Sequence, residues 1–468
     1  MTKAKNNPKI SALSPLPNTA TIRQRLQLGK TLRDKTPRHA HALWRPQIRR
    51  RDPIEILIES NQGRIPELLP IRYGRMVQSP FTFFRGASAV MASDLSRTPI
   101  AGNFTQICGD CHLLNFGGFA SPERKIIFDL NDFDETLLGP WEWDLKRLTT
   151  SFILASRHNG FSKSEARESA VICARNYRKF MAEFAQMKPL EVWYACLDVE
   201  TILESAKNPD TKRDLKKRIT KAIKRDVKEN DYPKLAESSH GRHRIKDNPP
   251  LIYHPAESRE KDFKRNVQEA YSRYRDSLPD DRRMLLDHYA VQDIAMKVVG
   301  VGSVGTWCGI VLHMARNRDP LFLQVKQAQP SVLEAYLGKS PYANHGQRVV
   351  VGQRLMQAAS DIFLGWTRGR EGRHFYVRQL RDMKIKPQVE TYQAETMQRY
   401  AKFCGWVLAR AHAKSGDAAC ISGYLGTNAH MDEALADFAE AYADQSERDH
   451  HALLEAVNQG RIQVFLEH

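Results

Sequence analysis

The chain has 468 residues, of which 41% are hydrophobic and 27% charged, and its formal net charge is +17. This composition is typical of a globular protein with a large core, and no run of about 18 apolar residues predicts a membrane span. The first residues lack the apolar centre of a secretory signal, so we expect a cytoplasmic protein, in which the seven cysteines form no disulfide framework.

Residues 1–51 form a basic leader with thirteen Lys or Arg and a single acid, Asp34. A segment with this charge can bind nucleic acid or another acidic partner. The alternative is a solvated, partly disordered leader with some helix from about residue 20, and the sequence favours this alternative.

Residues 52–290 are expected to be mainly helical. Proline-punctuated short helices are predicted over 52–76, and a loop rich in proline, histidine and charge is predicted over 231–262.

A short buried strand is predicted at the start of KIIFDLNDFDE, residues 125–135, which ends in a cluster of acids. A long helix follows over 141–158, because Leu145, Leu148 and Phe152 share one helical face.

The sequence pattern predicts a β-rich region over residues 291–380. A strand, a glycine-rich turn and two further strands are predicted, the last being LFLQVK at 321–326, and a helix over 347–361 precedes two more strands. Residues 381–468 are expected to be helical again. The predicted fold class is therefore α+β.

Several side chains with oxygen donors lie close together in the first half of the chain. Asp110, Asn115, Asp129, Asp132 and Asp134 fall within about 25 residues, on a loop, a strand and a second loop. Mg²⁺ prefers such oxygen ligands together with substrate phosphates. The alternative is a solvent-facing acidic turn, but the intervening apolar strand favours a magnesium site.

The stretch CGDCH at 108–112 permits two other interpretations. CxxCH is the attachment signature of a c-type haem, but haem attachment requires export, for which there is no signal. A structural zinc site requires a second pair of ligands, and only His112 lies near Cys108 and Cys111.

A glycine-rich stretch, GVGSVG, occupies residues 300–305. It precedes a strand rather than a helix, which argues against a dinucleotide site of the Rossmann type. A glycine-rich hairpin followed by a strand with Lys326 is typical of the way a kinase covers the phosphates of ATP. The alternative for Lys326 is an exposed strand lysine. The candidate nucleotide-binding residues of the turn are Gly300, Gly302, Ser303 and Gly305.

The sequence resembles known proteins at these motifs. GDCHLLN followed by NDFDETLLGPWEWDL resembles the HGDxHxxN … DFGDxxxGDPxxDL pattern of aminoglycoside phosphotransferases and related small-molecule kinases. More closely, the chain from about residue 70 resembles the bacterial family DUF2252, in stretches that include SPFTFFRG, GVGSVGT, LFLQVKQAQPSVLE and YVRQLRDMK. The resemblance implies a two-lobed, protein-kinase-like fold, and it supplies no substrate.

The resemblance also implies roles by motif position. Asp110 matches the catalytic aspartate, Asn115 the metal-binding asparagine and Asp132 the metal-binding aspartate, with Asp134 as a possible helper. Asp144 is expected to anchor the catalytic loop by hydrogen bonds.

Lys326 matches the phosphate-binding lysine, and its carboxylate partner is left open. Glu334 is the candidate, although it is only eight residues away, because the helix predicted over 347–361 contains no glutamate. Two further residues are weaker candidates: Asp417, in a second Gly-Asp pair, for catalysis, and Arg85 for binding an acidic substrate.

The order of the motifs is reversed relative to kinases, because Asp110 comes 190 residues before Gly300. We therefore expect a circularly permuted kinase fold and an ATP- and Mg²⁺-dependent phosphotransferase whose acceptor is an unidentified small molecule or protein. The alternatives are nucleotidyl transfer, a non-catalytic nucleotide-binding protein, a nucleic-acid-binding protein and a c-type cytochrome.

Overall fold

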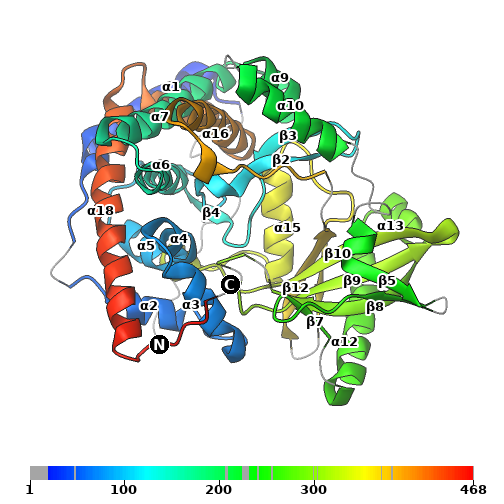
Figure 1. Cartoon of the computed structure of the whole chain (residues 1–468). Coiled ribbons are helices and arrows are strands. Elements are labelled where there is room, and N and C mark those ends of the chain that lie inside the picture. Colours follow the sequence, from blue (N-terminus) through cyan, green and yellow to red (C-terminus); the bar gives the residue numbers. More distant parts are fainter. Residues whose placement is uncertain are drawn as a thin grey trace, which may run out of the picture.

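The structure is a computed structural model that describes residues 19–46, 49–205, 209–223, 231–239, 242–254, 257–298, 300–302, 304–369, 372–380 and 383–466. A helical part and a part built on a six-stranded sheet lie side by side (Figure 1). The α+β class predicted from the sequence is confirmed. Within the described ranges no helix is both long and apolar enough to cross a membrane.

The helical part combines segments from both ends of the chain. The long helices α6, α7 and α16 pack together, and Gly405 of α16 allows close approach, since a Cβ there would lie 2.5 Å from the Cys173 carbonyl oxygen of α7. A capping box of Ser162 and Glu165 begins α7. The helices of this part are α1 (Ile22–Lys35), α2 (Pro53–Glu59), α3 (Leu69–Met76), α4 (Pro80–Gly86), α5 (Ser88–Leu95), α6 (Trp141–His158), α7 (Lys163–Phe184), α8 (Pro189–Tyr194), α9 (Val199–Glu204), α10 (Pro209–Ile223), α16 (Ala394–Ser415), α17 (Ala418–Leu425) and α18 (His430–Asn458).

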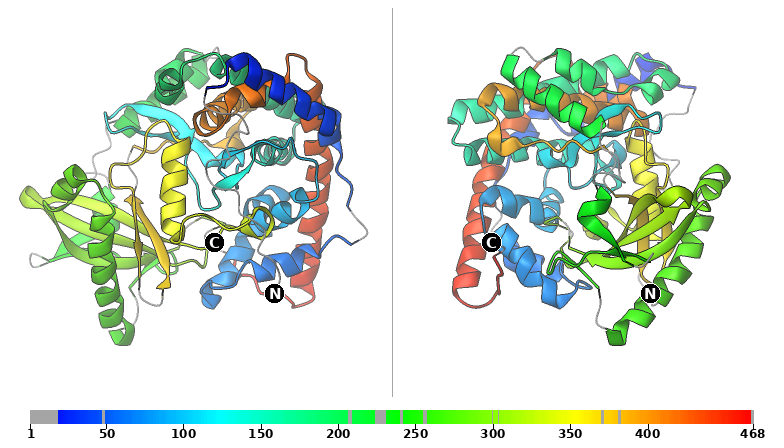
Figure 2. Two further views of the ribbon diagram at one scale, coloured as in Figure 1. Left: turned by 180° about the vertical axis from the view of Figure 1, so that it is seen from behind. Right: turned by 45° about the vertical axis from the view of Figure 1, so that its right-hand side comes forward.

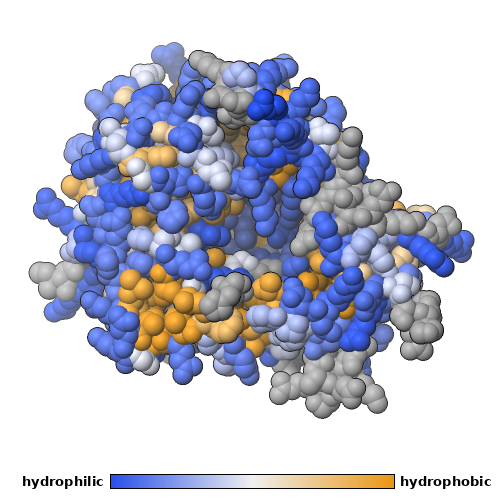
Figure 3. All heavy atoms as spheres, viewed as in Figure 1, coloured by the Kyte–Doolittle hydropathy of each residue, from blue (hydrophilic) through white to orange (hydrophobic). Residues whose placement is uncertain are grey.

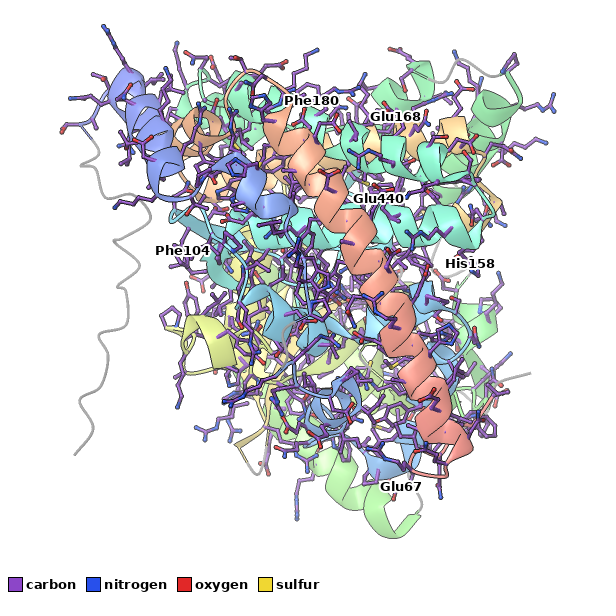
Figure 4. The ribbon with its side chains drawn as sticks, turned by 90° about the vertical axis from the view of Figure 1, so that its left-hand side faces the viewer. Glu67, Phe104, His158, Glu168, Phe180 and Glu440 are labelled. Carbon is purple, nitrogen blue, oxygen red and sulfur yellow. The ribbon has the colours of Figure 1, made fainter. Side chains whose placement is uncertain are left out.

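The long helix α18 runs diagonally over α6 and α7, as the view in Figure 4 shows. Arg167 of α7 reaches Glu433, Asp437 and Glu440 along α18, with nitrogen–oxygen distances of 2.7, 2.8 and 2.7 Å. The C-terminal helices thus close the same core as the central ones.

The basic leader contributes to this core. Gly29 of α1 and Gly423 of α17 let the two helices touch, because a Cβ on Gly29 would lie 2.0 Å from the Cys420 carbonyl oxygen. Arg25 of α1 pairs with Asp417 at 2.6 Å. The helix expected from about residue 20 is present, whereas residues 1–18 lie outside the described residues.

Two small two-stranded sheets lie where the sequence placed the acidic loops. β1 (Phe104–Ile107) pairs with β4 (Leu137–Pro140), and β2 (Phe116–Ala120) pairs with β3 (Ile126–Leu130), both antiparallel. β3 is the predicted buried strand, and all five of its residues are buried. The two small sheets bring the loop after β1 close to the loop after β3.

The large sheet is antiparallel, in the order β11-β12-β10-β9-β8-β7. Helix α15 (His345–Met356) lies between this sheet and the helical part, as Figures 1 and 2 show. The helix and strands predicted over 291–380 are thus found in order. The strands are β7 (Ile252–Tyr253), β8 (Tyr289–Lys297), β9 (Cys308–Ala315), β10 (Asp319–Ala328), β11 (Gly365–Arg368) and β12 (His374–Gln379).

The region before residue 290 differs from the prediction. The segment 231–262, expected to be a loop, contains β7, the hairpin of β5 (Ala236–Ser239) and β6 (Arg242–Ile245), and the short helix α11 (Tyr232–Leu235). Leu235 and Ile245 pack on Ile310 and Phe322 of the sheet, and α12 (Glu257–Asp276) and α13 (Asp280–Leu286) lie nearby. These elements extend the sheet part, because a few apolar residues among polar ones are enough to cover a sheet face.

Candidate functional site

Asp144 anchors the loop between β1 and β2, which carries Asp110. The Asp144 carboxylate accepts the backbone N–H of Cys108 at 2.7 Å and that of Gly109 at 2.8 Å. Gly109 has a φ of +83°, a conformation that favours glycine. Asp144 is only 1% exposed and lies 3.3 Å from His412 Nε2. The anchoring role expected for Asp144 is confirmed.

Asp110 is held by an arginine of α6. Both Nε and Nη2 of Arg147 contact Asp110 Oδ1, and Nε lies at 2.6 Å. No described residue donates a hydrogen bond to the second oxygen, Oδ2. Burial raises the pKa of Asp110 despite the opposing charge of Arg147. Arg147 thus fixes the carboxylate and leaves one oxygen available.

Asn115 and Asp132 lie on the two loops that the small sheets bring together. The Asn115 side chain donates to the Asp110 carbonyl oxygen, and the Asn131 N–H donates to the Asn115 carbonyl oxygen at 2.8 Å. Asp132 Oδ1 accepts the N–H of Asp134 at 3.2 Å. The two predicted metal ligands therefore face one space with amide and carboxylate oxygens, a donor set that fits Mg²⁺.

Asp134, predicted as a helper ligand, pairs with Lys326. Lys326 Nζ lies 2.8 Å from Asp134 Oδ2, and the Tyr376 hydroxyl donates to Asp134 Oδ1 at 2.6 Å. Burial opposes ionisation of Asp134, but the Lys326 ammonium outweighs burial and lowers the pKa to about 2. Lys326 is 3% exposed, so it is not the exposed strand lysine of the alternative interpretation.

Glu334 does not supply the carboxylate partner of Lys326. It begins the short helix α14 (Glu334–Leu337) beyond the end of β10, and its Oε1 lies 3.7 Å from His345 and 3.9 Å from Arg348. The Lys326 side chain instead shares a sheet face with Tyr376, its register partner on β12, and that face points toward Asp134.

The glycine-rich turn joins β8 to β9 and lies against the helical part. Gly300 and Gly305 have φ values of +68° and +86°. The Ile65 N–H donates to the Gly305 carbonyl oxygen at 2.7 Å, and Arg75 donates to that of Gly300. Ser303, predicted to bind nucleotide, lies outside the described residues.

Most of the predicted residues line one polar cleft. The surface of the protein is hollowed between its two parts (Figure 3). Lys326 and Gly305 are not part of the cleft lining, but Lys326 contacts it through Asp134. The predicted residues that line the cleft are Asp110, Asn115, Asp132, Asp134, Gly300 and Gly302.

The two cysteines of CGDCH point into the core. Cys108 and Cys111 are each 0% exposed. A hydrogen bond that the Cys108 thiol donates to Cys111, together with burial, raises the pKa of Cys108, and burial raises the pKa of Cys111 to about 12. With Asp144 they form a close trio, but Asp144 already accepts two backbone N–H groups. Thiols in this setting stay protonated and inaccessible, which argues against haem attachment and against a zinc site.

Asp417, the weaker candidate for catalysis, has a structural role. It caps α17 by accepting the Cys420 N–H at 2.9 Å, besides pairing with Arg25. Sequence reasoning missed Arg147 and Tyr376. Arg147 follows Asp144 by three residues on one helix face, a spacing that could have indicated a second contact to the same loop.

The fold and the cleft define a mixed α+β protein. Its cleft lies between a helical part and an antiparallel sheet, and acidic residues and the glycine-rich turn line it. The chain belongs to the family described as "Uncharacterized protein conserved in bacteria (DUF2252)", which matches residues 64–456. No curated protein and no solved structure matches the chain.

Proposed function

We propose that the protein is an ATP- and Mg²⁺-dependent phosphotransferase with a circularly permuted, kinase-like fold. The observation that carries the proposal is the convergence of Asp110, Asn115 and Asp132 with Gly300 and Gly302 on one cleft, although the glycines come much later in the chain. Kinases combine a base, two metal-binding residues and a glycine-rich turn at one site because phosphoryl transfer depends on positioning and charge stabilisation.

The order of elements in the sheet supports the kinase-like fold. A glycine-rich turn joins β8 and β9, and the next strand, β10, carries Lys326. In kinases a glycine-rich loop likewise precedes the phosphate-binding lysine, which lies on the third strand of its lobe. Because α6 precedes these strands and α16 follows them, the helical part is split around the sheet part, as a permutation requires.

Asp110 is proposed as the base. Its Oδ2 would accept the proton of an acceptor hydroxyl while the hydroxyl oxygen forms a bond to the γ-phosphorus of ATP. The bond from that phosphorus to the β–γ bridging oxygen breaks, and ADP leaves. Arg147 keeps the carboxylate oriented through Oδ1 during this step.

Asn115 and Asp132 would hold the metal, because both present oxygen donors to the cleft. When bound, Mg²⁺ neutralises charge on the phosphates. Lys326, fixed by Asp134 and Tyr376, adds positive charge behind them.

Nucleotidyl transfer is the second candidate, and one observation favours it. Helix α15 has no glutamate, and Lys326 pairs with an aspartate of the acidic loop instead, unlike the lysine–glutamate pair of protein kinases. Mass spectrometry of the acceptor after reaction separates the two, since one adds a phosphoryl group and the other an AMP group.

Calorimetric titration of the purified protein with Mg·ATP tests the proposal. We expect binding that Asp132→Ala abolishes and that Asp280→Asn, on the exposed start of α13, leaves unchanged. Absence of heat and of any thermal shift with the unaltered protein would show that the cleft is not a nucleotide site.

A further inference from the structure

Three arginines form one wall of the cleft, on the side of the helical part. Arg64 lies in the turn after α2, Arg72 on α3 and Arg85 on α4, and all three line the cleft together with Asp110. We call them the arginine wall. The glycine-rich turn lies against the same wall, because a Cβ on Gly302 would stand 3.7 Å from the Arg85 carbonyl oxygen.

Arg72 is deeply buried with only neutral partners. It is 2% exposed, and it donates to Asn61 Oδ1 at 2.9 Å and to the Gly86 carbonyl oxygen at 2.8 Å. Its Nε is buried and has no hydrogen-bond partner. A guanidinium that keeps its charge and has a donor unused is a ready site for an anion.

Arg64 and Arg85 likewise have no acidic hydrogen-bond partner among the described residues. Arg64 donates to the carbonyl oxygens of Ser60 and Val304, and Arg85 Nε is buried without a partner. Throughout the described ranges, none of the three arginines of the wall has a carboxylate oxygen within 4.0 Å. Arg147, in contrast, is neutralised by Asp110 in the same cleft.

The wall therefore carries positive charge that the protein does not compensate by ion pairing. Burial lowers the pKa of each of the three arginines; for Arg72, burial and, to a smaller extent, the positive charge of Arg64 lower it to about 9. Burying charges without partners is unfavourable, and an anion in the cleft would remove much of that cost.

We infer that the acceptor of the proposed phosphoryl transfer carries an anionic group, a phosphate or a carboxylate, which binds the arginine wall while its hydroxyl meets Asp110. The inference rests on the proposed function. The position of Arg85 carries it, since Arg85 lines the same cleft as Asp110 and His112. In the proposed function, the nucleotide phosphates already have Lys326 and the metal ligands as partners.

Inorganic phosphate, titrated by calorimetry into the protein without nucleotide, is the probe. Arg85→Gln is the main variant, because Arg85 makes no hydrogen bond in the described structure that folding would lose, and circular dichroism checks its fold. Arg64→Gln is the second variant. Arg282→Gln, at a side chain that is 36% exposed on α13, is the matched control.

We expect phosphate to bind the unaltered protein and the control equally, and Arg85→Gln to weaken it by about tenfold, as loss of a charge-assisted hydrogen bond does. Mg·ATP affinity of Arg85→Gln should stay within about twofold. Equal loss of Mg·ATP affinity would assign the wall to the nucleotide and overturn the inference, as would phosphate binding that ignores both substitutions or is absent. If phosphate binding depends on Arg85 but Mg·ATP does not bind at all, the anion site stands and the proposed function fails.

Discussion

Lys326 and Asp134 are 192 residues apart in the sequence and form an ion pair of 2.8 Å, in which the Lys326 side chain is buried and that of Asp134 is 28% exposed. The pair joins β10 of the sheet to the loop after β3, and so connects the two parts of the protein at the edge of the cleft. The Tyr376 hydroxyl completes it by donating to the other Asp134 oxygen.

Removal of one partner from this pair should destabilise the protein strongly. We expect Asp134→Asn to lower the free energy of unfolding by about 3–5 kcal/mol, because it leaves the buried Lys326 ammonium without its partner. Lys326→Met should cost less, because Asp134 is 28% exposed and keeps its bond from the Tyr376 hydroxyl. The double variant should lose less than the sum of the two. Urea unfolding measures all three. The same cycle on the exposed pair of Arg275 and Asp287 is the control, with an expected coupling of about 0–1 kcal/mol.

The anchor of the loop that carries Asp110 is a second test. Asp144→Ala removes the acceptor of two buried N–H groups, and each unsatisfied donor costs about 1–3 kcal/mol. Thermal unfolding should show the loss, and nucleotide binding should weaken because the loop that carries Asp110 loosens. Asp437→Asn, at a side chain that is 54% exposed on α18, should change neither. Unchanged stability of Asp144→Ala would mean that the loop holds its shape without this carboxylate.

The burial of Glu142 leads us to predict that the free energy of unfolding depends on pH. It is 0% exposed, its Oε1 accepts the Ala101 N–H and its Oε2 has no partner. Burial raises its pKa to about 7. The folded state therefore keeps a proton that the unfolded state has already lost, so the free energy of unfolding falls as pH rises from about 5 to 7.

Glu142→Gln cannot ionise and should remove this part of the slope, with a gain of up to about 3 kcal/mol above pH 7 relative to the unaltered protein. Urea unfolding at a series of pH values measures it. Glu395→Gln, at a side chain that is 70% exposed, should leave the slope in place. A parallel pair of pH profiles for the unaltered protein and Glu142→Gln would contradict the assignment.

The leader provides a fourth prediction. Gly29→Ala puts a Cβ into the contact with α17, and we expect a loss of about 1–3 kcal/mol from overpacking. Gln27→Ala, on the exposed side of the same helix, should be neutral. Differential scanning calorimetry distinguishes the two. Equal melting temperatures for Gly29→Ala and the unaltered protein would indicate that α1 does not dock on α17 in solution.

The sequence predicted the separate motifs of the site better than the contacts between them. The glycine turn, the strand with Lys326 and the loop with Asp110 could be found because short-range patterns encode them. The partner of Lys326 could not, since Glu334 was near in sequence while Asp134 was near in space. The β-hairpin over 231–262 was missed because its few apolar residues gain their burial only from the sheet beneath them.

By itself, the sequence determined the α+β class, the order of helical and β-rich blocks, and the oxygen-rich loops, because local propensity and periodicity are written into neighbouring residues. Only the tertiary structure decided that Arg147 holds Asp110, that the basic leader packs on α17, and that three arginines line the cleft without forming an ion pair in the described part of the chain. These are contacts between segments far apart in the chain. They depend on which faces the packed core brings together, and no local pattern records that choice.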